Sequence, residues 1–357
     1  MKKIKLKKKN ILIASGILLL IILLIVLLVL KPFKKKKTET KKSTKKTEEK
    51  VEVPKEKVDI INTESKTRPF AVVINNTPIA VKVQTGLNKA YIVYEFPTEG
   101  ATSRLMAMYK DIDEDLKLGT IRSARHNFID YAFESDAIFV AYGYSHYAED
   151  ELNKEGIINY INGMIHSKPF WRSNPENLAS EHTAYTSIGK IKDFAYNDKS
   201  YSKESSDAKN TVLLNYNTGD VDLSKKENVM NANEIDIVYG SIDTKFKYNE
   251  DTKMYTRIVN GNVTKDHENG EEFTTKNIIV QRLSYKMCSD NYYWDLNTVS
   301  SGEGYYITNG KAVPIKWSKD SRKDKTKYMY QDGKEIEVSD GRTYIEVQVT
   351  DKKTTIE

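Results

Sequence analysis

The run ILIASGILLLIILLIVLLVL, residues 11–30, most constrains how this chain can fold, because it holds no charged residue over 20 positions. Twenty apolar residues in an α-helix reach about 30 Å, the thickness of a bilayer's hydrocarbon core. A cleavable signal peptide has a shorter apolar segment and then a small-residue cleavage site, whereas lysines and Pro32 follow this run directly. The sequence therefore predicts one N-terminal transmembrane helix over residues 11–30, through which the chain contacts the membrane.

Charged segments flank the predicted span. Residues 1–10 hold six lysines and are expected to form a basic cytoplasmic tail. Residues 31–66 are rich in Lys, Glu, Thr and Ser, which predicts a charged, disordered tether. A short basic N-terminus before a single span usually places the following domains outside. We therefore expect a single-pass cell-membrane protein with extracytoplasmic C-terminal domains.

The net charge of +6 comes from the N-terminal segment. Residues 1–66 hold 19 Lys and Arg against 7 Asp and Glu, which leaves 37 basic and 43 acidic residues beyond them. A domain that binds nucleic acid carries clustered positive charge of its own. The acidic balance beyond residue 66 therefore argues against a nucleic-acid partner.

Two different patterns follow the tether and predict an α+β protein. Residues 67–210 alternate apolar strands (FAVVIN, YIVYEF, RLMAMYK, AIFVAYG) with helices expected over 124–135 and 181–196, a mixed α/β first domain. Residues 211–351 are rich in strand patterns and contain the turn signals Asn260-Gly261, Asn309-Gly310 and Asp332-Gly333. They predict an antiparallel β-rich second domain, with residues 352–357 as a tail.

The stretch IRSARHNF, residues 121–128, carries the strongest site signal. Ser123 is a candidate N-cap for the helix expected from residue 124, and Arg122 and Arg125 add two planar guanidinium donors at that end. Such a cluster can hold an external carboxylate or phosphate. The alternative is that the arginines pair with the protein's own carboxylates, Glu95, Glu99 or Asp130.

Further candidates surround this stretch. Glu95 and Glu99 lie on either side of a Pro-Thr turn, where they can act as an acid/base pair or neutralise the arginines, and Arg104 enters the next strand. His182 and Tyr185 are expected on one face of the helix over 181–196, where a structural histidine and a proton-transfer group are both possible. Trp171 stands beside Arg172, a pair that suits a sugar contact or a packed loop.

Several classes of chemistry have little support in the sequence. His126, His146, His166, His182 and His267 fall in no metal-ligand spacing, and no nucleophile-elbow motif positions Ser123. Cys288 is the only cysteine and has no catalytic motif around it. We expect no metal and no cofactor.

Several motifs in order resemble the YerB-like lipoprotein family, envelope proteins of Gram-positive bacteria without an assigned reaction. In the first part these are the stretch from RPFAVVINN to SRLMAMY, then LGTIRSARHNFIDYA and HTAYTS; in the second part they are NIIVQR, SSGEGYYITNGKAVPIKWSK and DGKEIEVSDGRTYIEV. The resemblance covers residues 68–351. It marks these motif positions: Asn75, Gly86, Tyr94, Glu95, Glu99, Gly100, Arg104, Arg122, Ser123, Arg125, Asp130, Gly143, His182 and Tyr185.

The chain also departs from the family pattern at His126, at Thr183 and at the YGYSHYA segment, and residues 11–30 stand in place of a lipid-modified cysteine. Residues and resemblance together favour an extracytoplasmic envelope protein that binds an anionic wall polymer or peptidoglycan fragment through Arg122, Arg125 and His182. Two alternatives stay open. One is a peptidoglycan-processing hydrolase or lyase that uses Glu95 or Glu99 with His182; the other is a scaffold that recruits envelope proteins.

Overall fold

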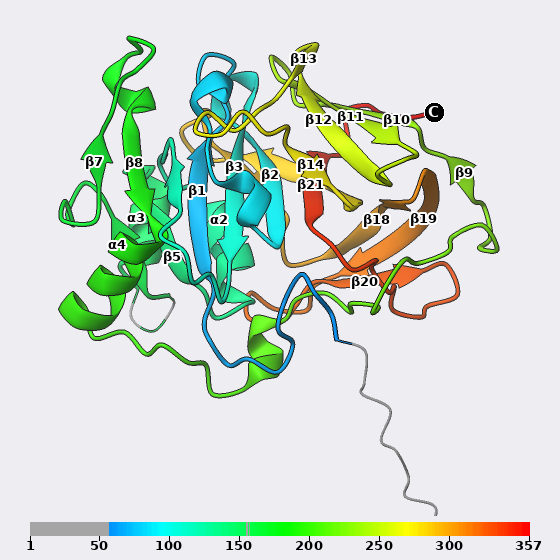
Figure 1. The fold of residues 1–357 in the computed structure, drawn as a ribbon, viewed down its shortest axis with the longest axis horizontal. Helices are drawn as coiled ribbons and strands as arrows, with labels where there is room; N and C mark the ends of the chain where they lie inside the picture. Colours follow the sequence, from blue (N-terminus) through cyan, green and yellow to red (C-terminus); the bar gives the residue numbers. More distant parts are fainter. Residues whose placement is uncertain (1–56, 155, 157) are drawn as a thin grey trace, which may run out of the picture. The chain divides into compact units, whose positions relative to one another are not determined.

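Six consecutive buried residues, FAVVIN, form strand β1 (Phe70–Asn75) inside the largest sheet of the protein (Figure 1). The computed structural model describes residues 57–154, 156 and 158–357, all within one compact unit that spans Lys55–Glu357. Alternate residues of β1 point to opposite faces, with Ala71 and Val73 in one apolar cluster and Val72 and Ile74 in another. Both faces of the sheet are therefore covered.

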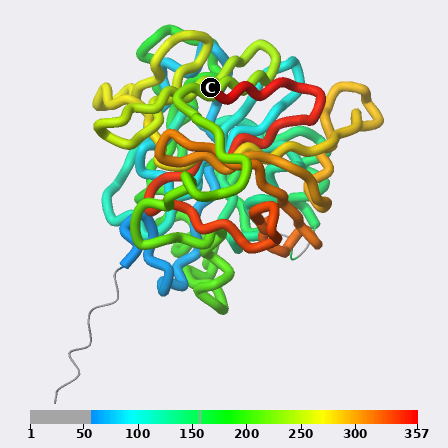
Figure 2. The backbone as a smooth tube through the Cα atoms, turned by 90° about the vertical axis from the view of Figure 1, so that its right-hand side faces the viewer, coloured from blue at the N-terminus to red at the C-terminus, as the bar shows by residue number. Residues whose placement is uncertain are grey.

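The large sheet is built from both halves of the chain. Its spatial order is β20 (Lys327–Tyr330), β19 (Lys311–Ser318), β18 (Ser301–Thr308), β15 (Asn277–Leu283), β21 (Thr343–Val349), β2 (Ile92–Thr98), β3 (Thr102–Tyr109), β1, β5 (Ile138–Ala141) and β6 (Tyr160–Asn162), and β9 (Met230–Asn231) pairs with β19. The two halves meet where β2 pairs in parallel with β21. In Figure 2 the C-terminal strands, orange to red, face the viewer.

Smaller sheets complete the strand structure. One consists of β13 (Asn262–Val263), β12 (Met254–Val259), β11 (Asp243–Asn249), β10 (Glu234–Val238) and β22 (Thr354–Ile356), with β14 (Thr274–Thr275) paired to β12. A second consists of β4 (Lys117–Gly119), β8 (Ala184–Ser187) and β7 (Trp171–Arg172), and β16 (Tyr285–Met287) pairs with β17 (Trp294–Leu296).

Helices are few and short in the described part of the chain. The α-helices are α2 (His126–Phe133), α3 (His146–Leu152) and α4 (Ile188–Asp193), which a π-helix (Phe194–Asp198) continues. Short 3₁₀-helices lie at Val81–Val83, Leu87–Lys89, Glu99–Ala101, Ser180–His182 and Ala208–Thr211. The described residues are thus mostly β-strands with few helices. The α+β prediction is confirmed only in this general form.

Two of the three turn signals of the second half are confirmed; at Asp332-Gly333 only Gly333 has a positive φ, 83°, so that turn is not of type I′. Asn260 and Gly261 have φ values of 47° and 80° and join β12 to β13, and Asn309 and Gly310, at 50° and 72°, join β18 to β19. Two consecutive positive φ values are what a type I′ turn requires. The boundary expected near residue 210 stays a prediction, since the large sheet runs through both halves.

The membrane-anchor prediction falls outside the described residues: the tail 1–10, the span 11–30 and residues 31–56 of the tether. Among the described residues, no helix is both long and apolar enough to cross a bilayer. The prediction of a disordered tether is wrong for its last ten residues, 57–66, which pack against the folded unit. Ile61 is buried in the core and the backbone N–H of Asp59 donates to Asp340, because this end of the segment carries apolar side chains.

Candidate functional site

The segment after β4 leads into the candidate site as extended backbone. Arg122 N–H donates to the Val73 carbonyl oxygen, and Ala124 N–H donates to that of Gly143. Helix α2 therefore begins only at His126, and Arg125 occupies its N-cap position without a side-chain cap bond. The expectation that Ser123 caps the helix is wrong, because strand-like pairing continues through residue 124, and Ser123 Oγ donates to the Tyr142 carbonyl oxygen instead.

This segment forms one wall of a pocket of about 340 Å³. We call it the arginine pocket; its lining residues include Arg122, Ser123, Tyr142, Tyr144, Met164, Arg172 and Glu181. It lies at the carboxyl ends of the parallel strands β5 and β6, the end of an open sheet where ligands commonly bind.

Buried polar and glycine positions make the pocket walls rigid. Asn162 is fully buried, and its Oδ1 accepts hydrogen bonds from the N–H groups of Gly143 (2.9 Å) and Met164 (3.0 Å), so it joins two walls. Gly143 has a φ of 91°, and a Cβ there would lie 2.8 Å from Ser123 Oγ. The close approach of the 122–124 and 142–144 segments therefore requires glycine at this position.

Two guanidinium groups line the pocket without a carboxylate partner. Among the described residues, neither Arg122 nor Arg172 forms an ion pair. Arg122 Nη1 donates only to the Glu181 carbonyl oxygen at 3.3 Å, and its covered Nε has no partner in the described part of the chain. Arg172 Nη1 donates to Ser180 O and Thr183 Oγ1, and its guanidinium carbon lies 4.8 Å from the Tyr142 ring centroid.

The neighbouring arginines behave differently. Arg125 forms a bidentate ion pair with Glu99, with Nε 2.8 Å from Oε2 and Nη2 bonded to Oε1. Arg104, nearly buried, lies 3.8 Å from the same carboxylate and donates to the Ser123 carbonyl oxygen. Burial tends to raise the pKa of Glu99, but the hydrogen bond and charge of Arg125, with that of Arg104, lower it overall. One carboxylate thus faces two arginines, and the alternative of internal pairing holds for Arg125.

His182 lies behind the pocket, at the end of the 3₁₀-helix Ser180–His182 rather than on a longer α-helix. Its Nδ1 is 2.8 Å from Asn75 Nδ2, and Asn75 Oδ1 accepts from Thr77, so Nδ1 acts as the acceptor. Burial lowers the pKa of His182, and the charge of Arg122 lowers it further. The helix expected over 181–196 is wrong at its start, because residues 184–187 pair with β4 and β7 as strand β8. His182 and Tyr185 therefore do not share a helical face.

Other sequence candidates lie apart from the pocket. Tyr185 is buried, its hydroxyl donates to the Val83 carbonyl oxygen, and its ring fills the space beside Gly119. Asp130 on α2 does not line the arginine pocket. Its carboxylate oxygens accept hydrogen bonds from Arg322 Nε and Thr298 Oγ1. Its carboxylate is therefore engaged by residues outside the pocket lining.

Glu95 is sealed between the large sheet and the β10–β14 sheet. Its side chain is fully buried and accepts hydrogen bonds from Arg257 Nη2 at 2.9 Å and from Ser103 Oγ at 2.6 Å. Glu346 is its partner on the adjacent strand β21, and the Tyr239 hydroxyl donates to Glu346. Burial and then the charge of Glu95 raise the pKa of Glu346 well above its usual range.

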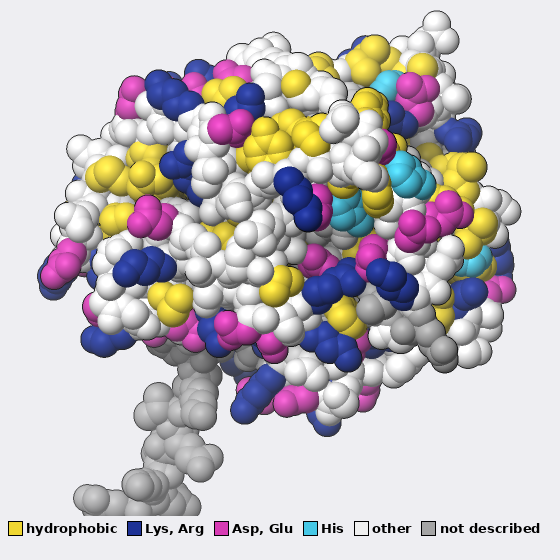
Figure 3. Space-filling model, turned by 180° about the vertical axis from the view of Figure 1, so that it is seen from behind, with side chains coloured by type: hydrophobic (Ala, Val, Ile, Leu, Met, Phe, Trp, Pro, Cys, Tyr) yellow, Lys and Arg dark blue, Asp and Glu magenta, His cyan; other side chains and the backbone are white. Residues whose placement is uncertain are grey.

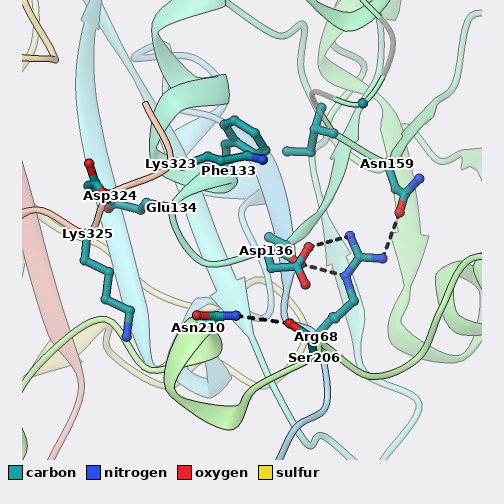
Figure 4. Close-up of a pocket in the computed structure, with 13 residues that line it drawn as sticks. Arg68, Phe133, Glu134, Asp136, Asn159, Ser206, Asn210, Lys323, Asp324 and Lys325 are labelled. Carbon is teal, nitrogen blue, oxygen red and sulfur yellow. Dashed lines mark hydrogen bonds and ion pairs between the residues drawn. The ribbon is translucent and has the colours of Figure 1, made fainter. Parts of the chain in front are cut away.

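A larger pocket of about 600 Å³ lies at the other end of β1 (Figure 4). Its charged side chains are mostly matched within the protein: Arg68 pairs with Asp136 and donates to Asn159, while Lys325 Nζ donates to backbone carbonyl oxygens. The arginine pocket differs from it because its cations lack carboxylate partners. No cluster of three or more metal-binding side chains occurs in the part of the chain described here.

The sequence identified one wall of the arginine pocket and missed the others. Arg172 was considered only as a neighbour of Trp171, and Tyr142, Tyr144 and Met164 were not candidates. The departure of the YGYSHYA segment from the family pattern was the available signal for the second wall. No spacing connects Arg172 to Arg122, since the two meet only through the pairing of β7 with β8 and the loop before it.

Comparison with known proteins assigns the family. Residues 58–202 match a domain described as "Protein of unknown function (DUF3048) N-terminal domain", and residues 235–345 match the corresponding C-terminal domain. The chain belongs to this family. A protein of Bacillus subtilis (strain 168) named "Putative lipoprotein YerB" is 30% identical over 293 residues, which cover 80% of this chain and 84% of that protein.

A solved structure agrees with this assignment. The crystal structure of YerB protein from Bacillus subtilis has a TM-score of 0.70 and 26% sequence identity, and the match covers 83% of this chain and 96% of that one. The resemblance inferred from the motifs is therefore confirmed, with the fold of the described residues shared with YerB.

Proposed function

We propose that this protein is a membrane-anchored, extracytoplasmic envelope protein that binds an anionic cell-wall polymer or peptidoglycan fragment in the arginine pocket. The observation that carries the proposal is the pair Arg122 and Arg172, two guanidinium groups at one pocket without an ion-paired carboxylate. Guanidinium groups bind carboxylate and phosphate groups through paired, charge-assisted hydrogen bonds. An external anion would supply the partner that the described residues lack.

The location of the pocket supports an outward-facing ligand. Residues 57–62 pack beside Asp340, and the next residues lead into the start of β1, whereas the pocket lies beyond the opposite ends of β5 and β6. The apolar run 11–30 and the printed name of the Bacillus subtilis relative, which describes a lipoprotein, both favour attachment at a membrane surface. Arg125 and Glu99 would position the pocket wall rather than bind ligand directly.

The enzymatic alternative has no supporting observation of its own. Glu95 is fully buried and bound by Arg257, and the low pKa of Glu99 makes it a poor general acid. A scaffold role likewise has no distinct feature in its favour. Ligand binding is therefore the function that the geometry supports best.

Retention on purified Gram-positive cell walls tests the proposal. The full chain in detergent micelles is incubated with intact walls and with walls from which acid has extracted the anionic polymers. Arg122→Gln and Arg172→Gln should each weaken retention on intact walls by roughly tenfold, since each removes charge-assisted bonds worth about 1.5–3 kcal/mol. Lys334→Gln, at a side chain 82% exposed, removes the same charge elsewhere and is the matched control. Equal retention of all three variants would reject the pocket as the binding site.

A further inference from the structure

A cluster of four aromatic rings lies beside the arginine pocket, on α3 and on the β16–β17 hairpin. We call it the aromatic shelf; it consists of His146, Tyr147, Tyr292 and Tyr293. Tyr293 is central, with ring centroids 5.5 Å from His146, 5.9 Å from Tyr147 and 4.9 Å from Tyr292. Figure 3 shows histidine side chains beside hydrophobic ones on the face that it presents.

The shelf is exposed at its two ends. The side chain of His146 is 57% exposed, and Tyr292 is also 57% exposed, among the most exposed large apolar residues of the described chain. Tyr147 and Tyr293 are half-buried beneath them. Free aromatic surface is therefore available to a ligand next to rings that are already fixed in place.

Contacts from both elements hold the shelf rigid. The Tyr147 hydroxyl lies 2.7 Å from Ser289 Oγ of the hairpin, and His146 Nε2 lies 3.6 Å from Asp290 Oδ2. Asn127 of α2 ties the hairpin down through the carbonyl oxygen of Trp294 and the N–H of Leu296. The rings are thus presented with little freedom left to lose on binding, which favours affinity.

The shelf and the arginine pocket are continuous through a short stretch of chain. Tyr142 and Tyr144 line the pocket, and His146 and Tyr147 follow two residues later. On the other wall, the Arg125 guanidinium carbon lies 5.2 Å from the Tyr293 ring centroid, and Arg125 is two residues after Ser123 of the pocket. One extended ligand can reach both surfaces.

We propose that the aromatic shelf binds the sugar rings of a polysaccharide whose anionic groups occupy the arginine pocket. This inference rests on the proposed function and names its ligand class, an acidic glycan. Aromatic rings offer an apolar face to the C–H face of a pyranose, while Asp290 and the tyrosine hydroxyls beside them can bind the sugar hydroxyl groups. A simple anion would use the pocket and leave the shelf empty.

A protein partner fits the shelf less well. A specific protein interface buries about 1,000 Å² or more around a desolvated apolar centre. The shelf offers only four rings, two of them half-buried, and the Asp290 carboxylate lies beside His146 at its edge. Its size and polar border suit a few sugar rings.

Calorimetric titration of the full chain with two small probes separates the shelf from the pocket. The probes are a neutral tetramer of N-acetylglucosamine and inorganic pyrophosphate. Tyr292→Ala and His146→Ala should each lower affinity for the tetramer by about three- to tenfold and leave pyrophosphate affinity unchanged. Arg122→Gln should do the reverse, and Tyr305→Ala, a half-buried tyrosine on β18, should change neither.

The outcomes distinguish the two proposals. If Arg122→Gln leaves pyrophosphate affinity unchanged, the arginine pocket is not an anion site, and the tetramer result still reports on the shelf. If the tetramer does not bind at millimolar concentration, or binds equally to Tyr292→Ala, His146→Ala and the unmodified chain, the shelf proposal is wrong. If the tetramer fails while protease treatment of walls abolishes retention, the shelf faces a protein instead.

Discussion

Arg257 and Arg122 stand in contrasting surroundings. Arg257 on β12 is fully buried, and its charge meets Glu95 at 2.9 Å and the nearby Glu346. Arg122 lies at a pocket, donates to one backbone carbonyl oxygen at 3.3 Å and forms no ion pair within 4 Å among the described residues; the charge of Glu181 acts on it from farther away, and the charges of Arg125 and Arg104 oppose it. The contrast shows that the partners of an arginine decide its role: one closes the seam between two sheets, and the other leaves positive charge for something outside the protein.

The largest expected effect is on the buried arginine. Arg257→Met strands the Glu95 carboxylate between two sheets, so the free energy of unfolding should fall by about 3–5 kcal/mol. Urea denaturation followed by circular dichroism measures this. The double variant Arg257→Met with Glu95→Gln is the matched control and should recover part of the loss. A single variant as stable as the unmodified chain would show that the seam does not depend on this ion pair.

An intermediate effect is expected at Arg125, whose surroundings lie between the two extremes. Arg125→Gln removes both hydrogen bonds to Glu99; among the described residues, Arg104 at 3.8 Å is then the one cation left within 4 Å of the Glu99 carboxylate. The free energy of unfolding should fall by about 1.5–3 kcal/mol. Thermal unfolding and wall retention measured side by side check this. Unchanged stability together with lost wall retention would show that Arg125 binds the ligand rather than stabilising the fold through its ion pair with Glu99.

The pH dependence of stability sharpens the description of the seam. Because the folded pKa of Glu346 is raised, the folded state holds a proton that the unfolded state releases above its ordinary pKa near 4.5. The stability that this proton gives the folded state is complete at low pH. It is lost as the pH rises, at about 1.4 kcal/mol for each pH unit between the unfolded and the folded pKa of Glu346. Glu346→Gln should therefore gain stability relative to the unmodified chain between pH 5 and pH 8. Parallel curves for the two proteins would contradict a raised pKa.

The smallest effect is expected at Arg122 itself. Arg122→Gln removes a cation without an ion-paired carboxylate, so its free energy of unfolding should change by no more than about 0.5 kcal/mol. Denaturation in the absence of any wall component measures this. A loss of several kcal/mol would reveal an internal role and erase the contrast with Arg257.

The sequence predicted strands better than it predicted side-chain partners. FAVVIN matches β1 residue for residue, because a run of apolar residues with β-branched side chains has few other stable conformations. Residues 184–187 were expected in a helix, yet they form β8 because β4 and β7, both distant in sequence, supply the pairing. Local pattern carries no information on such partners.

The same limit applies to the candidate site. The sequence placed Arg122, Arg125, Glu95 and Glu99 together on chemical grounds, and the fold separates Glu95 because Arg257 lies opposite it on another sheet. No sequence motif marks Arg257. What distinguishes it is its ion pair with Glu95, a residue 162 positions away in the sequence. The aromatic shelf was likewise invisible, because its rings come from segments about 145 residues apart.

The parallel pairing of β2 with β21 also sets an order of folding. Strand β2, residues 92–98, finds its second neighbour only in residues 343–349, near the end of the chain. Until β21 has been synthesised and has crossed to its place, β2 has one unpaired edge and is lined with apolar residues, the kind of edge that pairs with other chains. The N-terminal half therefore has to wait for nearly the whole protein, which makes a helper that covers β2 during synthesis more useful here than in a chain whose halves fold separately.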